Sequence, residues 1–99
     1  MQPPYTVEQL KLALIPVFSK NNVRRATLFG SYAKGKATLR SDVDLLVDSG
    51  LHGMQFFGLL EDVSNSLECE VDLIDVQDIV PDSKIDQEIR HTGVVIYEQ

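Results

Sequence analysis

Two aspartates, Asp42 and Asp44, stand one residue apart in a strand-like run. Because side chains alternate along a strand, both carboxylates are expected on the same side of a sheet. With α-carbons about 6.7 Å apart, they would repel by roughly 2 to 3 kcal/mol at an effective dielectric near 20. A divalent cation would reverse that cost, and oxygen-only ligands favour Mg²⁺, with Mn²⁺ as a substitute, over zinc. A turn cap at Asp42 and a solvated strand end at Asp44 would explain the same spacing.

Gly30 and Ser31 come directly after a strand-like segment and supply what phosphate binding needs. Glycine lets the backbone approach a ligand closely, the serine hydroxyl can donate, and the amides that open a helix attract anions. Alone, this dipeptide is more often an ordinary strand-to-helix turn than a phosphate site. Its short distance from Asp42 along the chain is what points to a combined metal and phosphate site.

The segment from Gly30 to Lys36 also matches most of a Walker phosphate loop. That motif requires a magnesium-binding serine or threonine directly after the lysine, but Ala37 stands there and Thr38 comes one residue late. A phosphate-loop enzyme also needs a larger parallel sheet than the remaining residues can form. The Walker interpretation is therefore disfavoured.

The hydrophobic pattern predicts the elements that must position these residues. Thr6 and Gln9 form a capping box that starts a first helix, Pro16 should kink or split it, and Asn21 and Asn22 end it. Further helices are expected at Phe56–Leu67 and from Asp82 to about Arg90, and strands at Arg24–Phe29, Val43–Val47, Val71–Val76 and Val94–Tyr97. The order predicts an α/β fold with a small mixed sheet of about four strands flanked by helices, in a single domain over residues 1–99.

Composition narrows the classes of partner. The chain has 99 residues, 43% of them hydrophobic, and a net charge of -6, with most lysines and arginines before residue 41 and nearly all acids after it. This balance disfavours extended nucleic acids, whereas a basic patch with Arg24, Arg25, Lys34, Lys36 and Arg40 could hold a small polyphosphate. No segment is apolar enough to span a membrane, and the lone Cys69 fits a reducing compartment, so a cytoplasmic location is expected.

The stretch from Phe29 to Val47 closely resembles the signature of the minimal nucleotidyltransferases, relatives of the polymerase-beta superfamily. The resemblance implies that a third aspartate from a later strand, here Asp72, joins Asp42 and Asp44 in binding metal and in catalysis. It also implies nucleotide-binding roles for Gly30, Ser31, Lys34 and Ser41. The family commonly has arginine in place of Lys34, and a lysine cannot make the same two-pronged phosphate contact. By strand alternation Glu70 is the next candidate ligand, whereas Asp75 should point to the opposite face.

Stand-alone domains of this size resemble the antitoxins of toxin-antitoxin pairs whose toxins are HEPN-domain ribonucleases. The resemblance implies transfer of AMP from ATP to a tyrosine hydroxyl of such a toxin. Two alternatives remain: a non-enzymatic module that neutralises its partner by docking, and nucleotidyl transfer to a small molecule such as an aminoglycoside. Other residues have structural interpretations: Phe56 and Phe57 in the core, Cys69 in a strand, and His52 and His91 on the surface.

Overall fold

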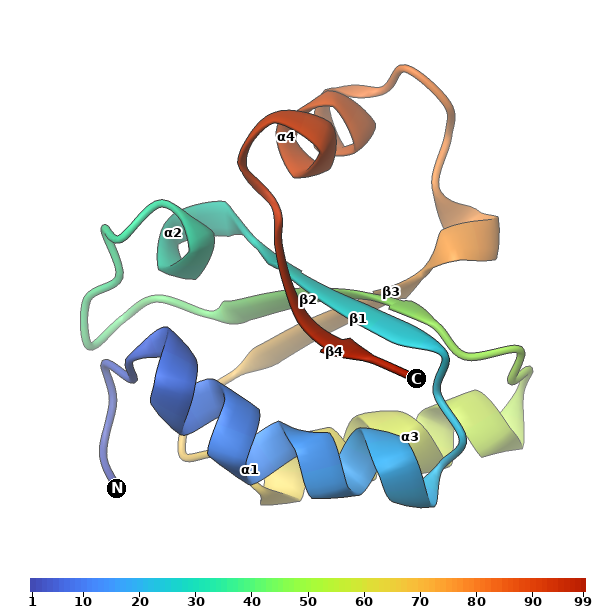
Figure 1. The fold of residues 1–99 in the computed structure, drawn as a ribbon, viewed down its shortest axis with the longest axis horizontal. Coiled ribbons are helices and arrows are strands. Elements are labelled where there is room, and N and C mark those ends of the chain that lie inside the picture. The colour runs from blue at the N-terminus through green and yellow to red at the C-terminus, as the bar shows by residue number, and fades with distance from the viewer.

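The computed structural model describes residues 1–99 and contains one four-stranded sheet with helices on both faces (Figure 1). The strand order is β3-β2-β1-β4, with β2 and β3 parallel and the other neighbours antiparallel. The predicted α/β fold with a small mixed sheet is confirmed. The elements are α1 (Val7–Lys20), β1 (Arg25–Phe29), α2 (Gly30–Ala33), β2 (Val43–Asp48), α3 (Met54–Asn65), β3 (Val71–Asp75), the short 3-10 helix η1 (Val76–Asp78), α4 (Lys84–Thr92) and β4 (Val94–Glu98).

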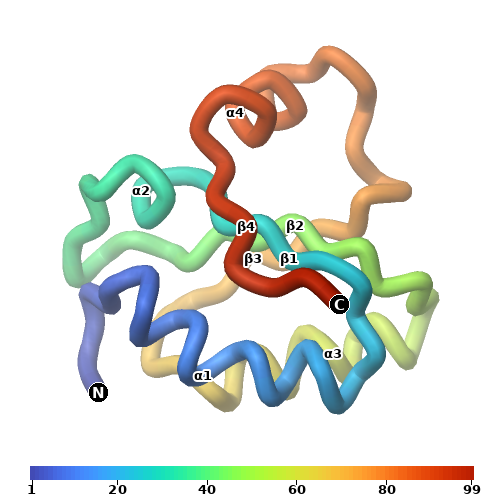
Figure 2. Tube along the Cα trace, in the orientation of Figure 1, coloured from blue at the N-terminus to red at the C-terminus, as the bar shows by residue number.

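Helices α1 and α3 lie side by side on one face of the sheet, and α4 lies over the other (Figures 1 and 2). The core fills the space between the sheet and the α1/α3 layer. It is built from every second residue of β2 and from one face of each helix: Leu10, Leu14, Phe18, Val43, Leu45, Val47, Leu59 and Val63 are all fully buried. Each such side chain contributes about 1.5 to 3 kcal/mol to stability. Because this face of β2 is buried, its intervening residues must face α4.

Helix α1 begins as predicted and does not split at Pro16. Thr6 Oγ1 accepts from the Gln9 amide at 3.1 Å, and Gln9 Oε1 accepts from the Thr6 amide at 3.0 Å, which confirms the capping box. The helix is continuous from Val7 to Lys20 with Pro16 inside it, so of the two predicted outcomes, a kink or a split, the split does not occur. Pro16 lies on the exposed side, while Leu14 and Phe18 are buried on either side of it. Their packing holds both turns against the sheet despite the missing backbone donor.

Two further sequence predictions are corrected by the packing. Phe56 packs against the core, but Phe57 is 57% exposed because it lies on the outer side of α3. Cys69 is not in a strand: it lies in the turn between α3 and β3, which begins at Val71. His52 and His91 are exposed, as predicted. No helix combines the length and the apolar character that crossing a bilayer would require.

Helix α4 is held to the sheet differently from α1 and α3, since none of its residues is buried. Ser83 caps its start by accepting from the Asp86 amide at 3.2 Å. At its end, Gly93 has an ordinary negative φ, but a Cβ there would collide with the carbonyl oxygen of Ile89 and lie 3.0 Å from Thr27 Cγ2. The missing side chain therefore lets α4 turn tightly into β4 above the sheet.

Candidate active site

The sheet brings the predicted metal ligands to one edge of the α4 face. Asp44 is opposite Asp72 in the parallel β2-β3 register and opposite Phe29 in the antiparallel β1-β2 register. Gly30 follows Phe29 directly, so Gly30, Asp44 and Asp72 form a row across three adjacent strands. Asp42 precedes β2 by one residue and is exposed, and Asp44 is half-buried. The structure therefore places residues from three separate parts of the sequence next to one another.

Gly30 is in direct contact with the Asp44 side chain. Its φ is +73°, and an added Cβ would collide with Asp44 Oδ2 and lie 3.1 Å from Asp44 Cγ. Two independent constraints, the left-handed backbone and the touching carboxylate, thus require glycine here. The start of α2 is thereby held against the carboxylate that the sequence assigns to metal binding.

The pKa of Asp44 is raised from 3.8 to about 6. Desolvation by burial is the largest cause, followed by the negative charges of Asp72, Asp42 and Glu88 in that order. Three other carboxylates thus act on Asp44, and the contribution of Asp42 is the repulsion expected from the sequence spacing. A bound cation would favour the ionised form of Asp44 and relieve this repulsion.

The raised pKa predicts how stability depends on pH. The folded chain holds the Asp44 proton more tightly than the unfolded chain, so the free energy of unfolding should fall as pH rises from about 4 to above 6. Replacing Asp44 by asparagine should remove that part of the decline. Urea unfolding of both proteins without divalent cations, at several pH values in this window, measures the difference. Parallel stability curves for wild type and Asp44→Asn would contradict the raised pKa.

The basic residues of the α2 region have different surroundings. Lys34 caps the C-terminal end of α2, and its Nζ lies 2.9 Å from Oε1 of Glu88 on α4. Lys36 and Arg40 are exposed and make no ion pair. Lys34 is therefore the cation of this region that pairs with α4, through a glutamate whose charge also acts on Asp44.

Ser41 has a role in shaping the loop before Asp42. Its Oγ accepts from the Thr38 amide at 2.8 Å, and its own amide donates to the Thr38 carbonyl at 3.1 Å. The hydroxyl is thus engaged in the turn between Thr38 and Ser41. This turn fixes where the chain enters β2, and a direct contact of Ser41 with nucleotide remains a prediction.

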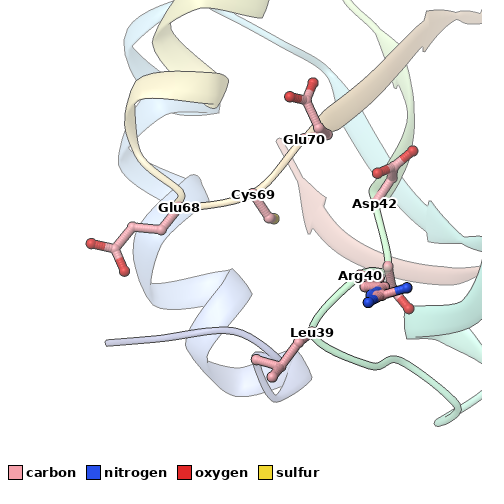
Figure 3. A pocket seen from close by; sticks show the side chains of 7 residues that line it. Leu39, Arg40, Asp42, Glu68, Cys69 and Glu70 are labelled. Atoms are coloured by element: carbon pink, nitrogen blue, oxygen red, sulfur yellow. The ribbon is translucent and has the colours of Figure 1, made fainter.

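A cavity of about 470 Å³ opens beside Asp42, where β2 and β3 begin (Figure 3). In Figure 3 the carboxylates of Asp42 and Glu70 stand at its upper rim, Leu39 lies at the opposite rim, and Glu68 points outward. The complete lining is Leu39, Arg40, Ser41, Asp42, Glu68, Cys69 and Glu70. The cavity is lined by the segment before β2 and the segment before β3, and Asp42 is the one predicted metal ligand in its lining.

Asp75 is buried and engaged in hydrogen bonds within the sheet. It is 2% exposed and accepts hydrogen bonds from the Ser49 amide at 3.3 Å, from the Ser49 hydroxyl and from the Gln77 amide at 3.2 Å. These bonds link the end of β2 to the end of β3. Asp75 therefore stabilises the sheet at a distance from the row of carboxylates at the other end of the strands.

The residues present suit Mg²⁺ better than a structural metal. No three His, Cys, Asp or Glu side chains are close enough to form a ready-made metal cage. Mg²⁺ does not need one, because it keeps several waters and usually binds one or two carboxylates together with substrate phosphates. An open set of aspartates that repel one another, next to a candidate phosphate loop, fits that mode of binding.

Sequence reasoning missed Glu88. It contributes to the raised pKa of Asp44 and pairs with Lys34, yet it lies more than 40 residues after Asp44 on a helix with no motif. Nothing in the local sequence distinguishes it from the other acids of α4. Only the folding of α4 onto the sheet brings it to the site.

Comparison with known proteins agrees with this arrangement. Residues 13–99 match the family model described as polymerase beta, nucleotidyltransferase. The chain is 33% identical over 78 residues, covering 76% of it and 83% of the relative, to a candidate protein adenylyltransferase from Methanocaldococcus jannaschii.

Solved structures share the fold at lower identity. One is a chain of a toxin-antitoxin structure with AMP-PNP, at a TM-score of 0.75 and 22% identity, covering 90% of this chain and 73% of that one. Another is a chain of the complex between a tri-AMPylated HEPN toxin of Shewanella oneidensis and an MNT antitoxin, at a TM-score of 0.71 and 19% identity, covering 95% and 74%. The family match over most of the chain, together with the 33% identical relative, shows that the chain is a nucleotidyltransferase and belongs to the polymerase beta nucleotidyltransferase family.

Proposed function

We propose that this chain transfers AMP from ATP to a tyrosine hydroxyl of a HEPN-type toxin and thereby acts as its antitoxin. The observation that carries the proposal is the row formed by Gly30 directly after β1, Asp44 on β2 and Asp72 on β3, with Lys34 at the other end of the short helix that Gly30 begins. A metal and phosphate site of this kind suits phosphoryl transfer, which depends mainly on positioning and on neutralising charge. The relative's description as a candidate protein adenylyltransferase and the AMPylated toxin in a structural neighbour support the choice of acceptor.

Each residue has a proposed role in this reaction. Asp42, Asp44 and Asp72 would hold Mg²⁺, which when bound neutralises phosphate charge and lowers the pKa of an attacking hydroxyl. The Gly30 backbone and the Ser31 hydroxyl would hold the outgoing phosphates, and Lys34 would supply positive charge to them. Asp72 would also orient the acceptor hydroxyl.

The row of residues also sets the direction of transfer. The acceptor oxygen forms a bond to the α-phosphorus of ATP, the bond to pyrophosphate breaks, and the hydroxyl proton passes to a nearby carboxylate such as Asp72. Attacking and leaving oxygens lie roughly in line in such reactions. With pyrophosphate at Gly30 beside β1, the acceptor must approach from the β3 side, where the cavity beside Asp42 opens.

Leu39 is expected to contact the acceptor protein, because it lines this cavity and is 73% exposed. Leu39→Ser should raise the KM for the partner protein about tenfold, a typical cost for losing an apolar anchor. The Kd for Mg-ATP should not change. Leu12→Ser is the matched control, since Leu12 is 78% exposed but lies on the outer side of α1. Equal KM values for the two variants would show that the acceptor does not bind at this cavity.

The alternative of a non-enzymatic antitoxin makes a different prediction. Coexpression of the toxin with wild-type chain should restore growth and increase the toxin's mass by whole AMP units. Asp42→Ala and Asp44→Ala should still copurify with the toxin but should neither modify nor neutralise it. Neutralisation by these variants without any mass gain would show that docking alone is sufficient.

A further inference from the structure

Lys34, which is proposed above to bind the phosphates of the nucleotide, forms an ion pair with Glu88 in this structure. Lys34 Nζ is 2.9 Å from Glu88 Oε1, and the two side chains are 41% and 31% exposed. This is the only ion pair that joins α4 to another element, because Arg90 pairs with Asp82 and Asp86 beside or within its own helix. Of the charged residues on α4, Glu88 is therefore the one turned toward the site.

Glu88 also adds negative charge where a triphosphate would bind. Its charge acts on Asp44, together with those of Asp72 and Asp42. Bound Mg²⁺ would compensate the three aspartates, but Glu88 lies on α4, outside the row that they form. A triphosphate beside Gly30 would therefore face one carboxylate whose counter-ion is Lys34 alone.

We infer that Glu88 is the counter-ion that Lys34 gives up when nucleotide binds, and that it thereby sets the nucleotide affinity. The inference rests on the phosphate-binding role of Lys34 under the proposed function. A half-exposed ion pair contributes little stability, so its exchange costs little. A triphosphate carries several charges and competes well for a lysine, which makes one point contact and can be redirected by rotating its side chain. Glu88 thus lowers the affinity for nucleotide without contacting the reacting atoms.

Removing the carboxylate charge tests this directly. Glu88→Gln keeps the side-chain size and should bind Mg-AMP-PNP about threefold to tenfold more tightly than wild type, as expected for losing one competing charge. Glu98→Gln is the control: it removes the same charge from an ion pair of 2.8 Å with Arg25, which begins β1 at the end away from Gly30. The affinity of the control should match wild type. A gain in affinity is a readout that general loss of structure would not produce.

The role of Lys34 is tested by a double-mutant cycle measured by titration calorimetry. In a Lys34→Gln background, Glu88→Gln should improve the Kd by a smaller factor than it does in wild type, because relief of repulsion remains but no lysine is left to release. Weaker or unchanged binding by the single variant Glu88→Gln would overturn the inference, and so would the same gain in both backgrounds. If wild type binds and the variant binds no better, only this inference fails. If neither protein binds Mg-AMP-PNP, the proposed nucleotide site fails as well.

Discussion

Asp44→Asn should lower the rate of AMP transfer by at least about a thousandfold, since metal-held charge is worth several kcal/mol in the transition state. The same change should leave the chain at least as stable at neutral pH. Asp44 is half-buried among Asp72, Asp42 and Glu88, and its pKa is raised because the ionised form is unfavourable there. An uncharged side chain of the same shape removes the repulsion along with the proposed metal ligand.

Asp48→Asn is the matched control for this change. Asp48 lies on the same strand and the same face as Asp44, but at the opposite end of β2, paired with Arg25 in the register. The Asp48→Asn variant should release pyrophosphate at a rate close to that of wild type, whereas the Asp44→Asn variant should release none above background. If the activity of Asp44→Asn were within tenfold of the control, Asp44 would have no essential role in the reaction. Loss of folding in Asp44→Asn would contradict the view that the carboxylate opposes stability.

Gly30→Ala should cost about a hundredfold or more in activity and about 1 to 3 kcal/mol in stability, because the methyl group combines a strained φ with a collision. The collision is with Asp44 Oδ2, so the carboxylate must move from its place in the row. Steady-state rates and urea unfolding curves measure the two effects separately. The two measurements together test whether the contact between Gly30 and Asp44 matters for activity.

Gly35→Ala separates backbone strain from this contact. Gly35 has nearly the same φ, +71° against +73°, but a Cβ there would meet nothing within 4 Å. The Gly35→Ala variant should lose about as much stability as strain costs Gly30→Ala, but it should keep most of its activity. If both variants lose activity equally, the contact between Gly30 and Asp44 has no special role.

Most elements of the fold were predictable because local patterns determine them. The capping box at Thr6, the period-2 burial of β2 and a helix that begins shortly after Asp82 all appear in the structure as the sequence indicates. Pro16 and Phe57 show where this reasoning fails. Whether a proline splits a helix depends on how firmly its neighbours pack against the sheet, and whether a phenylalanine is buried depends on which side of α3 faces α1.

The residues of the candidate site also divide into those that local sequence patterns place and those that they do not. Asp42 and Asp44 share a face because of strand geometry, and Asp44 lies beside Gly30 because the antiparallel register of β1 and β2 places it opposite Phe29. Asp72 could be placed only by resemblance, since the sequence does not reveal that β3 pairs with β2 in register. Glu88 could not be placed, because its position depends on how α4 folds back over the sheet. Contacts between distant segments are decided by tertiary packing.

The most direct test of the proposed reaction is to incubate the chain and the HEPN-type partner proposed for it with ATP labelled on either the α- or the γ-phosphate. With Mg²⁺, the α-label should appear on a tyrosine of the partner and the γ-label should not. A chelator, or the Asp42→Asn and Asp44→Asn changes, should abolish the labelling. Transfer of the γ-label, or α-labelling that persists without these two aspartates, would contradict the site described here.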